Sequence, residues 1–275
     1  MIIQAYIDES YTNEADGAPL LMPCCISKLG KWLTFDKAWK GMLRKEKLEY
    51  IHAIDLFHAK TPYTRENGWS FIKRQKLARL IDKIINRDVS YGVCLVLNRD
   101  DFNWFKNTPD KNFNNMLESD YGLAFRMCLS WLNAFIPVLY PNEKNLELQI
   151  FYEEGHPKSG CIQVIFDKFK ADVPGAFIKS EPKSARKAEL YGLQAADVFG
   201  YNFLYIEREK KFDSHLVKIE DSLKFNNKGR FFRVPINRDT LADLRDAIIL
   251  QKPRVLKKYR HLLTDKEKST HQTIE

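Results

Sequence analysis

The sequence predicts an α/β fold in which helices cover a mixed β-sheet. Two patterns lead to this prediction. Short apolar runs, rich in β-branched and aromatic residues, alternate with longer segments whose apolar residues recur every three or four positions. Strands and helices in such an order generally build a sheet with helices packed on it. The chain has 275 residues, 44% of them hydrophobic, which is enough for a sizeable core.

The expected strands are short apolar runs that end in turn-forming or charged residues. Met1–Ile7 stops at a polar stretch that begins with Asp8, which suits a strand followed by a loop. Leu20–Ile26 is a second candidate, although Pro23 cannot donate to a sheet and argues against a central position. Three later runs have the same character: Val89–Leu97, Leu146–Tyr152 and Phe177–Ser180.

Helices are expected where apolar residues fall on one face. The clearest case is Arg74–Ile85, in which leucines and isoleucines recur at helical steps. Other segments with helical spacing are Phe35–Glu49, Met116–Leu139, Cys161–Phe169 and Glu189–Ile206. Weaker helical patterns occur around Leu241–Leu250.

The chain is interpreted as one domain with an extension, because no Gly/Ser-rich or Pro-rich linker divides it. Residues 1–210 are expected to form the α/β domain. Residues 211–263 are expected to form a helical and basic extension of that domain. Residues 264–275 are polar and are expected to be disordered.

The composition indicates a cytoplasmic protein with an anionic partner. The formal net charge is +8, and nucleic acid is the commonest partner of such a basic chain, although basic proteins without one also exist. The five cysteines have no C-x-x-C spacing, which favours buried thiols in a reducing compartment over a zinc site. We expect neither a signal peptide nor a membrane span, since no apolar run approaches the ~20 residues that a span needs.

Two acidic pairs fall at strand ends. Asp8 and Glu9 follow the first predicted strand, and Glu153 and Glu154 follow the strand Leu146–Tyr152. Functional side chains gather at strand ends in α/β sheets. Each pair is also compatible with an ordinary turn, because acidic residues are favoured there.

Asp197 is the most unusual acidic residue, because nearly all its neighbours are apolar or small. A buried charge needs a partner or a metal ion. Gln194 lies on the same helical face, and small residues such as Gly192 and Gly200 would let the helix pack close to the sheet. The alternative is a core aspartate satisfied by backbone groups or by an arginine.

Carboxylates from two strand ends and a helix have the chemistry that Mg²⁺ or Mn²⁺ requires, since both are hard cations that prefer oxygen ligands. Two such ions roughly 4 Å apart could activate a water molecule and stabilise the leaving oxygen of a phosphodiester. Within the first pair, strand alternation predicts that Glu9 turns to the side opposite Asp8. Asp8 is therefore the firmer candidate.

Several short motifs resemble a known family. Tyr6-Ile7-Asp8-Glu9-Ser10 resembles the opening Y-x-D-E-S-G motif of the bacterial domain-of-unknown-function-3800 family, and Leu193-Gln194-Ala195-Ala196-Asp197 resembles its L-Q-x-A-D motif. Other likenesses are His52–Phe57 to its F-H-A-x-D segment, Glu153–Pro157 to its D/E-x-G turn, and Lys183-Ser184 to its S-K or K-S element. Two departures are Tyr11, which stands at the usual glycine, and the region beyond about Lys210, which the resemblance does not cover.

The resemblance implies an RNase H-like fold for residues 1–210 and a nuclease activity, often near mobile elements or phage-defence genes. It implies a ligand set by position, with Asp8, Glu153 and Asp197 as ligands and with Glu9 and Glu154 as possible substitutes. His52 could orient a phosphate or water, or move a proton near neutral pH. It could equally be a structural histidine bonded to Asp55.

Cations near the motifs are candidates for binding substrate phosphates. Lys183, Arg186 and Lys187 lie closest in sequence to the proposed site. Residues 224–233 interleave cations with aromatic residues, which suits nucleic-acid contact but also a half-buried hairpin.

The leading hypothesis is therefore a divalent-metal-dependent nuclease that hydrolyses phosphodiester bonds of DNA or RNA. The first alternative is a non-catalytic module that binds nucleic acid or protein on the same scaffold. A weaker third reading is a phosphohydrolase that acts on a small nucleotide. The sequence does not distinguish DNA from RNA.

Overall fold

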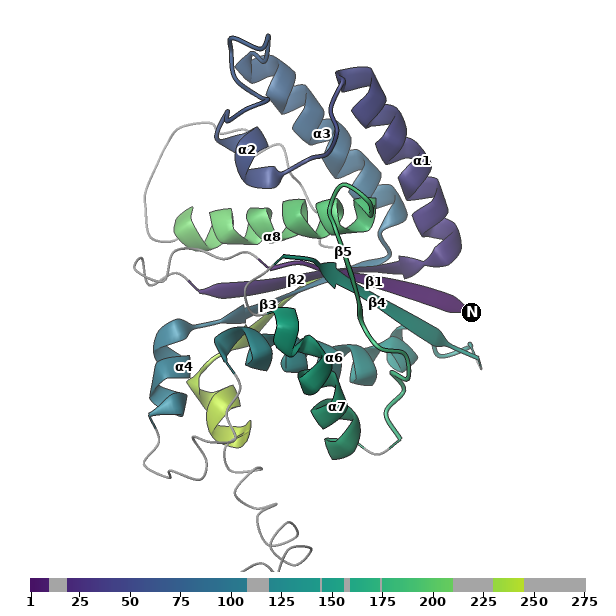
Figure 1. Cartoon of the computed structure of the whole chain (residues 1–275), viewed down its shortest axis with the longest axis vertical. Helices are drawn as coiled ribbons and strands as arrows, with labels where there is room; N and C mark the ends of the chain where they lie inside the picture. Colours follow the sequence, from purple (N-terminus) through teal and green to yellow (C-terminus); the bar gives the residue numbers. More distant parts are fainter. Residues whose placement is uncertain are drawn as a thin grey trace, which may run out of the picture.

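A six-stranded mixed β-sheet forms the centre of the molecule in the computed structural model (Figure 1). The structure describes residues 1–9, 19–107, 119–143, 145–155, 159–173, 175–209 and 230–244. The strands are β1 (Ile2–Ile7), β2 (Leu20–Lys28), β3 (Tyr91–Leu97), β4 (Glu147–Glu153), β5 (Lys183–Ala185) and β6 (Phe231–Ile236). Their order in the sheet is β5-β4-β1-β2-β3-β6. Only β2 runs antiparallel to its two neighbours, and the other three strand pairs are parallel.

Helices cover both faces of this sheet (Figure 1). One face carries α1 (Leu29–Glu46), α2 (Ala53–Phe57), α3 (Phe71–Asp88) and α8 (Tyr191–Glu209), and we call it the α8 face. The opposite face carries α4 (Arg99–Lys106), α6 (Asp120–Leu139) and α7 (Ile162–Asp172), and we call it the α6 face. A short 3-10 helix, η2 (Ser159–Cys161), precedes α7, and a helical segment at 238–244 also belongs to the α6 face. The predicted α/β class with a mixed sheet is confirmed.

The two faces have separate apolar cores, which follow from the alternation of side chains along the strands. In β1, the side chains of Ile3, Ala5 and Ile7 are buried among residues of the α6 face. Tyr6 is buried on the α8 face instead, where its ring stacks on Phe151 and packs edge-on against a tryptophan of α1. The same alternation, carried one residue further, directs Asp8 toward the α8 face.

Pro23 lies in β2, between β1 and β3, despite the argument against a central position. Its carbonyl accepts a 3.0 Å hydrogen bond from the backbone N–H of Asp8, so the peptide of Pro23 faces β1. The paired register of β1 and β2 reaches only to Ile7 and Cys24. Proline has no N–H group, and the hydrogen bond that Pro23 therefore cannot donate to β1 lies one position beyond the last paired residues.

The expectation of close packing between α8 and the sheet is confirmed. A Cβ atom at Gly192 would lie 2.4 Å from the ring of Tyr6, and one at Gly200 would lie 2.6 Å from the ring of Pro23. Neither ring can move aside easily, because each belongs to a residue of an internal strand. Glycine at both positions therefore lets α8 lie directly on β1 and β2.

Several predicted elements differ from the observed ones. Phe177–Ser180 is not a strand: Ile178 is fully buried on the α6 face, so its apolar character reflects burial and not strand pairing. The strand at this edge is β5, whose three polar or small residues give no strand pattern. β6, α2 and α4 were not predicted as separate elements. The expected extension at 211–263 and tail at 264–275 lie mostly or wholly outside the described residues.

Helix α6 is, by length and composition, apolar enough to cross a membrane, contrary to the expectation that no segment would be. Ten of its twenty residues are buried, and eight of these ten belong to the apolar core of the α6 face. Packing against the sheet therefore accounts for its apolar sequence.

Candidate metal centre

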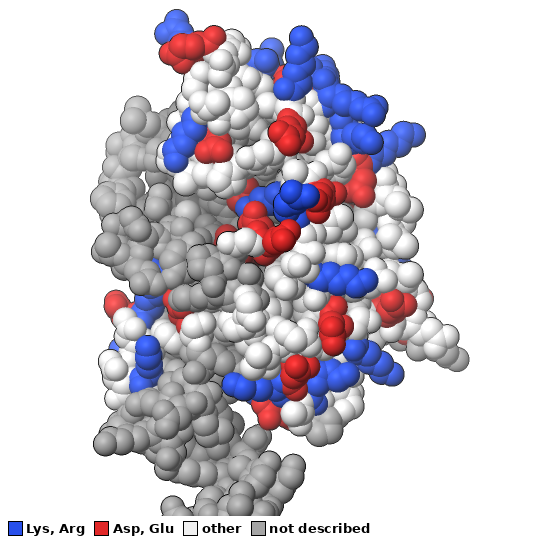
Figure 2. Space-filling view, viewed as in Figure 1, with Lys and Arg blue, Asp and Glu red and all other residues white. Residues whose placement is uncertain are grey.

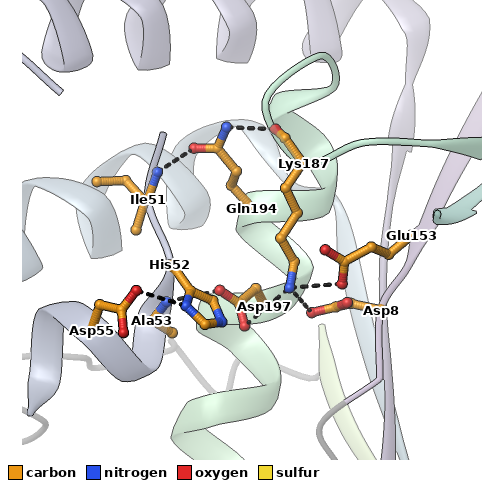
Figure 3. Close-up of polar contacts among 9 residues, drawn as sticks. All are labelled: Asp8, Ile51, His52, Ala53, Asp55, Glu153, Lys187, Gln194 and Asp197. Carbon is orange, nitrogen blue, oxygen red and sulfur yellow. Dashed lines mark hydrogen bonds and ion pairs between the residues drawn. The ribbon is translucent and has the colours of Figure 1, made fainter. Parts of the chain in front are cut away.

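Carboxylates from two neighbouring strands meet at one edge of the sheet. β1 and β4 are adjacent and parallel, with Ile7 paired to Tyr152. Asp8 and Glu153 each come one residue later, so their side chains lie side by side at this end of the two strands (Figure 3). Asp197 reaches the same place from α8, which crosses above these strands.

The ammonium group of Lys187 lies between these three carboxylates (Figure 3). Its Nζ is 2.8 Å from Oε2 of Glu153, 3.2 Å from Oδ2 of Asp8 and 3.6 Å from Oδ1 of Asp197. The Lys187 side chain is only 11% exposed and that of Asp8 only 1%. The centre of the cluster is thus a position built for a cation.

Glu9 also belongs to the cluster. Asp8, Glu9 and Glu153 each offer one carboxylate oxygen, and these three oxygens lie within 4.8 Å of one another. The expectation that Glu9 turns away from Asp8 is wrong. The N–H of Asp8 still bonds to Pro23 of β2, but Glu9 lies two residues past the end of β1, where strand alternation no longer sets the direction of the side chain. Glu154 differs: its side chain is exposed, while its backbone N–H donates to the carbonyl of Ala185.

Because these carboxyl groups are packed closely together, their pKa values shift in different directions. Burial raises the pKa of Asp8 well above its ordinary value, and the neighbouring carboxylates raise it further while Lys187 opposes them. Burial and the charge of Glu153 likewise raise the pKa of Glu9 to about 8. Burial would also raise the pKa of Glu153, but a hydrogen bond with Asp8 and the charge of Lys187 outweigh it, so that pKa is lowered.

Lys187 stays charged for the converse reason. Burial alone would lower the pKa of its ammonium group, but the charges of Asp8, Asp197 and Glu153 raise it far above its ordinary value. The pair of Lys187 and Glu153 is therefore ionised, while Asp8 and Glu9 retain their protons at higher pH than ordinary carboxyl groups.

One buried oxygen atom of the cluster lacks a hydrogen-bond partner among the described residues. Oδ1 of Asp8 is buried and has no hydrogen-bond partner among the described residues. A buried carboxylate oxygen without a partner is costly, and a cation or a donated hydrogen bond would satisfy it. Mg²⁺ and Mn²⁺ take oxygen ligands of this kind, so the residues present fit such a cation.

Two side chains of α8 fix the segment that carries His52. Gln194 is fully buried, and its Oε1 accepts from the backbone N–H of Ile51 at 2.8 Å and from the indole of Trp39 at 2.8 Å. One turn later, Oδ2 of Asp197 accepts from the backbone N–H of Ala53 at 2.8 Å. Both bonds use N–H groups on either side of His52 (Figure 3).

His52 stands at the rim of the cluster, with its side chain 38% exposed. Its Nδ1 lies 2.9 Å from Oδ2 of Asp55, the partner expected for a structural histidine. The ring is nevertheless close enough to the cluster that its positive charge would lower the pKa of Glu153. The two roles considered for His52 are therefore compatible in this arrangement.

The three cations expected to bind substrate lie in different settings. Lys183 is exposed on the edge strand β5. Arg186 is exposed and its Nε donates to Glu189 at 2.8 Å. Lys187 lies inside the carboxylate cluster. In the view of Figure 2, acidic side chains gather near the middle of the molecule, and a denser group of Lys and Arg lies toward α1.

Two residues of the site have roles that the sequence did not reveal. Lys187 was expected at the phosphate-binding surface, and no local pattern distinguishes it from nearby cations. Gln194 gave a usable signal, since a buried amide in an apolar helix needs partners. Its Nε2 donates to the backbone carbonyl of Lys187 at 2.7 Å, which ties α8 to the lysine.

Neither a scan against protein-family models nor a search of the curated proteins finds a match for this chain. The likeness to the domain-of-unknown-function-3800 family therefore stays a prediction that rests on the motifs alone.

Proposed function

We propose that this protein is a divalent-cation-dependent nuclease with an RNase H-like fold, which hydrolyses phosphodiester bonds of DNA or RNA. The observation that carries the proposal is the meeting of carboxylates from β1, β4 and α8 around one buried cation position. Such an arrangement buries several charged groups at one point. The desolvation cost of doing so is not required by a structural role alone.

The sheet supports the RNase H-like assignment. That assignment needs two acidic strand ends side by side and a third carboxylate from a helix on the sheet. β1 and β4 are parallel neighbours, and α8 lies close on the same sheet because of Gly192 and Gly200.

Asp8, Glu9 and Glu153 are the residues that would hold the cation. Their oxygens lie close enough to share one ion, and Oδ1 of Asp8 has no competing partner among the described residues. A divalent cation would supply positive charge to a phosphodiester oxygen and lower the pKa of a water molecule. Cation binding must displace the protons that Asp8 and Glu9 retain, so binding strengthens as pH rises.

His52 and Lys187 supply the remaining chemistry of the chain itself. The bond from Asp55 orients the His52 ring and leaves Nε2 for a second partner, so the ring can accept or donate a proton at the rim. Lys187 offsets the mutual repulsion of the carboxylates. Exposed Lys183 and Arg186 and the net charge of +8 would attract a polyanionic substrate.

The direct test is hydrolysis of single- and double-stranded DNA and RNA in the presence of Mg²⁺ or Mn²⁺. We expect Asp8→Asn and Glu153→Gln each to lower the rate by about 100-fold or more, a loss typical of removing a group that stabilises transition-state charge. Glu154→Gln is the matched control, because it removes the same charge one residue away on an exposed side chain. Its rate should stay within about twofold of the unchanged protein.

An active preparation that needs no divalent cation, or that is indifferent to Asp8→Asn, contradicts the proposal. A small nucleotide cleaved in preference to every polymer would replace the substrate class and leave the site intact.

A second candidate function is a non-catalytic module that binds nucleic acid or protein. One observation favours it: the ammonium group of Lys187 pairs with three carboxylates and so offsets part of their charge from within the chain. This alternative predicts nucleic-acid or protein binding that weakens with salt but is unaffected by a chelator, and no binding of Mn²⁺ at millimolar concentration.

A further inference from the structure

We infer that this site holds a single divalent cation, bound by Asp8, Glu9 and Glu153. The ammonium group of Lys187 takes the place that a second cation would need, between those strand ends and Asp197. The inference rests on the proposed cation site and changes what the sequence alone predicts, which is two ions shared among Asp8, Glu153 and Asp197.

The lysine occupies one half of the cluster. Its Nζ contacts Oδ2 of Asp8 at 3.2 Å, Oε2 of Glu153 at 2.8 Å and Oδ1 of Asp197 at 3.6 Å. These are three oxygens from three different elements, which is the ligand set that an ion on this side would have to use. An ammonium group and a divalent cation repel each other and cannot share those oxygens.

The lysine is also fixed in place. Its backbone carbonyl accepts a 2.7 Å hydrogen bond from Nε2 of Gln194, and that amide is itself held by Trp39 and by the N–H of Ile51. The side chain is buried apart from 11% of its surface. The ammonium group is therefore a permanent part of the cluster and not a surface charge that happens to lie nearby.

The other half of the cluster is left for a metal ion. Oδ1 of Asp8 is buried, has no partner among the described residues, and belongs to the same carboxylate whose Oδ2 faces the lysine. Glu9 and Glu153 each offer one carboxylate oxygen, and these oxygens lie within 4.8 Å of each other and of one carboxylate oxygen of Asp8. Asp197 is not part of this group, and its Oδ2 is already taken by the N–H of Ala53.

The charges agree with one ion. Four carboxylates surround one ammonium group, which leaves three negative charges when all four are ionised. One divalent cation reduces this to a single negative charge. Two would leave a positive site around a lysine that is already buried. One ion and two ions would leave net charges of equal size and opposite sign, but only a single ion avoids a net positive charge around Lys187.

The experiment is a titration of the full chain with Mn²⁺, in which calorimetry gives the number of ions bound and electron paramagnetic resonance counts the free ion. We expect one Mn²⁺ per chain in the unchanged protein and two in Lys187→Gln, where the second set of oxygens is released. Lys168→Gln is the matched control, since it removes an exposed lysine on α7 and should still bind one.

A second pair of variants keeps the inference testable if Lys187→Gln does not fold. Glu9→Gln should weaken the single Mn²⁺ site at least tenfold, whereas Asp197→Asn, which keeps an oxygen for the N–H of Ala53, should change it less than threefold. Equal losses in both variants overturn the inference.

The outcomes separate this inference from the proposed function. Two Mn²⁺ ions in the unchanged protein, or one ion in a folded Lys187→Gln variant, overturn the role of Lys187 while the metal-dependent nuclease stands. No Mn²⁺ in either protein overturns both.

Discussion

The two faces of the sheet bury different kinds of side chain. Among the described residues, the core of the α6 face is built from apolar side chains on β1, β2, β3, β4 and β6 and on α4, α6, α7 and the helical segment at 238–244. Its buried charged residues, Arg99 and Asp120, are the first residues of α4 and α6. The α8 face has an apolar core of similar extent, but α8 also brings the buried amide of Gln194 and the carboxylate of Asp197 to the sheet. The candidate site thus belongs to one face only.

The difference lies in how each face is stabilised. Apolar burial is non-directional, and many residues contribute similar amounts. A buried polar group needs a particular partner, and losing that partner leaves the remaining group unsatisfied. The α6 face should therefore control stability alone, whereas the α8 face should couple stability to cation binding and to pH.

The largest expected effect concerns the α6 face. Leu129 is fully buried in α6, so Leu129→Ala should lower the free energy of unfolding by about 3 kcal/mol, through lost burial and the cavity that it leaves. Denaturant unfolding measures the loss, and Mn²⁺ titration of the folded variant should give an unchanged affinity. A weakened affinity in the folded variant would show that the two faces are coupled.

The next effect is the pH dependence of the α8 face. Glu9 has an ordinary pKa of 4.5 and a pKa of about 8 in the folded chain, so the folded state binds more protons between these values. The free energy of unfolding should therefore fall as pH rises from about 4.5 to 8, with a slope of at most about 1.4 kcal/mol per pH unit. Denaturant unfolding across this range, without divalent cations, measures it.

Two variants sharpen that result. Glu9→Gln should flatten the pH dependence, because the titrating group is removed. Leu129→Ala should lower stability equally at every pH and keep the slope. A slope that survives in Glu9→Gln would assign the pH dependence to Asp8 or to groups elsewhere.

A smaller effect is expected from the contact between α8 and β2. Gly200→Ala places a Cβ atom against the ring of Pro23 and should destabilise by about 1–3 kcal/mol while weakening Mn²⁺ binding, since α8 carries Asp197 and the bond to Lys187. Gly41→Ala in α1 meets nothing within 4 Å and should instead stabilise by up to about 1 kcal/mol. Thermal unfolding of the two variants compares them, and equal shifts would contradict the close packing.

The smallest effect belongs to the exposed cations. Lys183→Gln should change the free energy of unfolding by less than about 0.5 kcal/mol. If Lys183 contacts a phosphate, the slope of log affinity against log salt for nucleic acid should decrease by about 0.9. Binding measured at several salt concentrations checks this, and an unchanged slope removes Lys183 from the substrate surface.

The apolar elements were the easiest to predict, because their periodicity is local. α3 and α8 were located to within a few residues, and β1, β3 and β4 to within about two. β5 escaped because three exposed residues at an edge have no pattern, and Phe177–Ser180 was mistaken for a strand because Ile178 is buried by tertiary packing.

Some residues of the site could likewise be predicted from the sequence, and others could not. Asp8 and Glu153 could be placed together because strand ends meet at one edge, and Asp197 because a charge in an apolar helix needs a partner. The positions of Lys187 and Glu9 could not be predicted. Each depends on where several distant elements converge, and the turn after β1 determines the direction of Glu9 as much as the strand does.

The distance along the chain between Asp8 and Asp197 has a consequence for synthesis. At about 5–20 residues per second, the roughly 190 residues between them take about 10–40 s to be added. During that time a nascent chain carries the end of the first strand but neither Lys187 nor Asp197. The residues that enclose the cation position are therefore incomplete. A chain with this layout has no complete centre on the ribosome until most of the domain has been made.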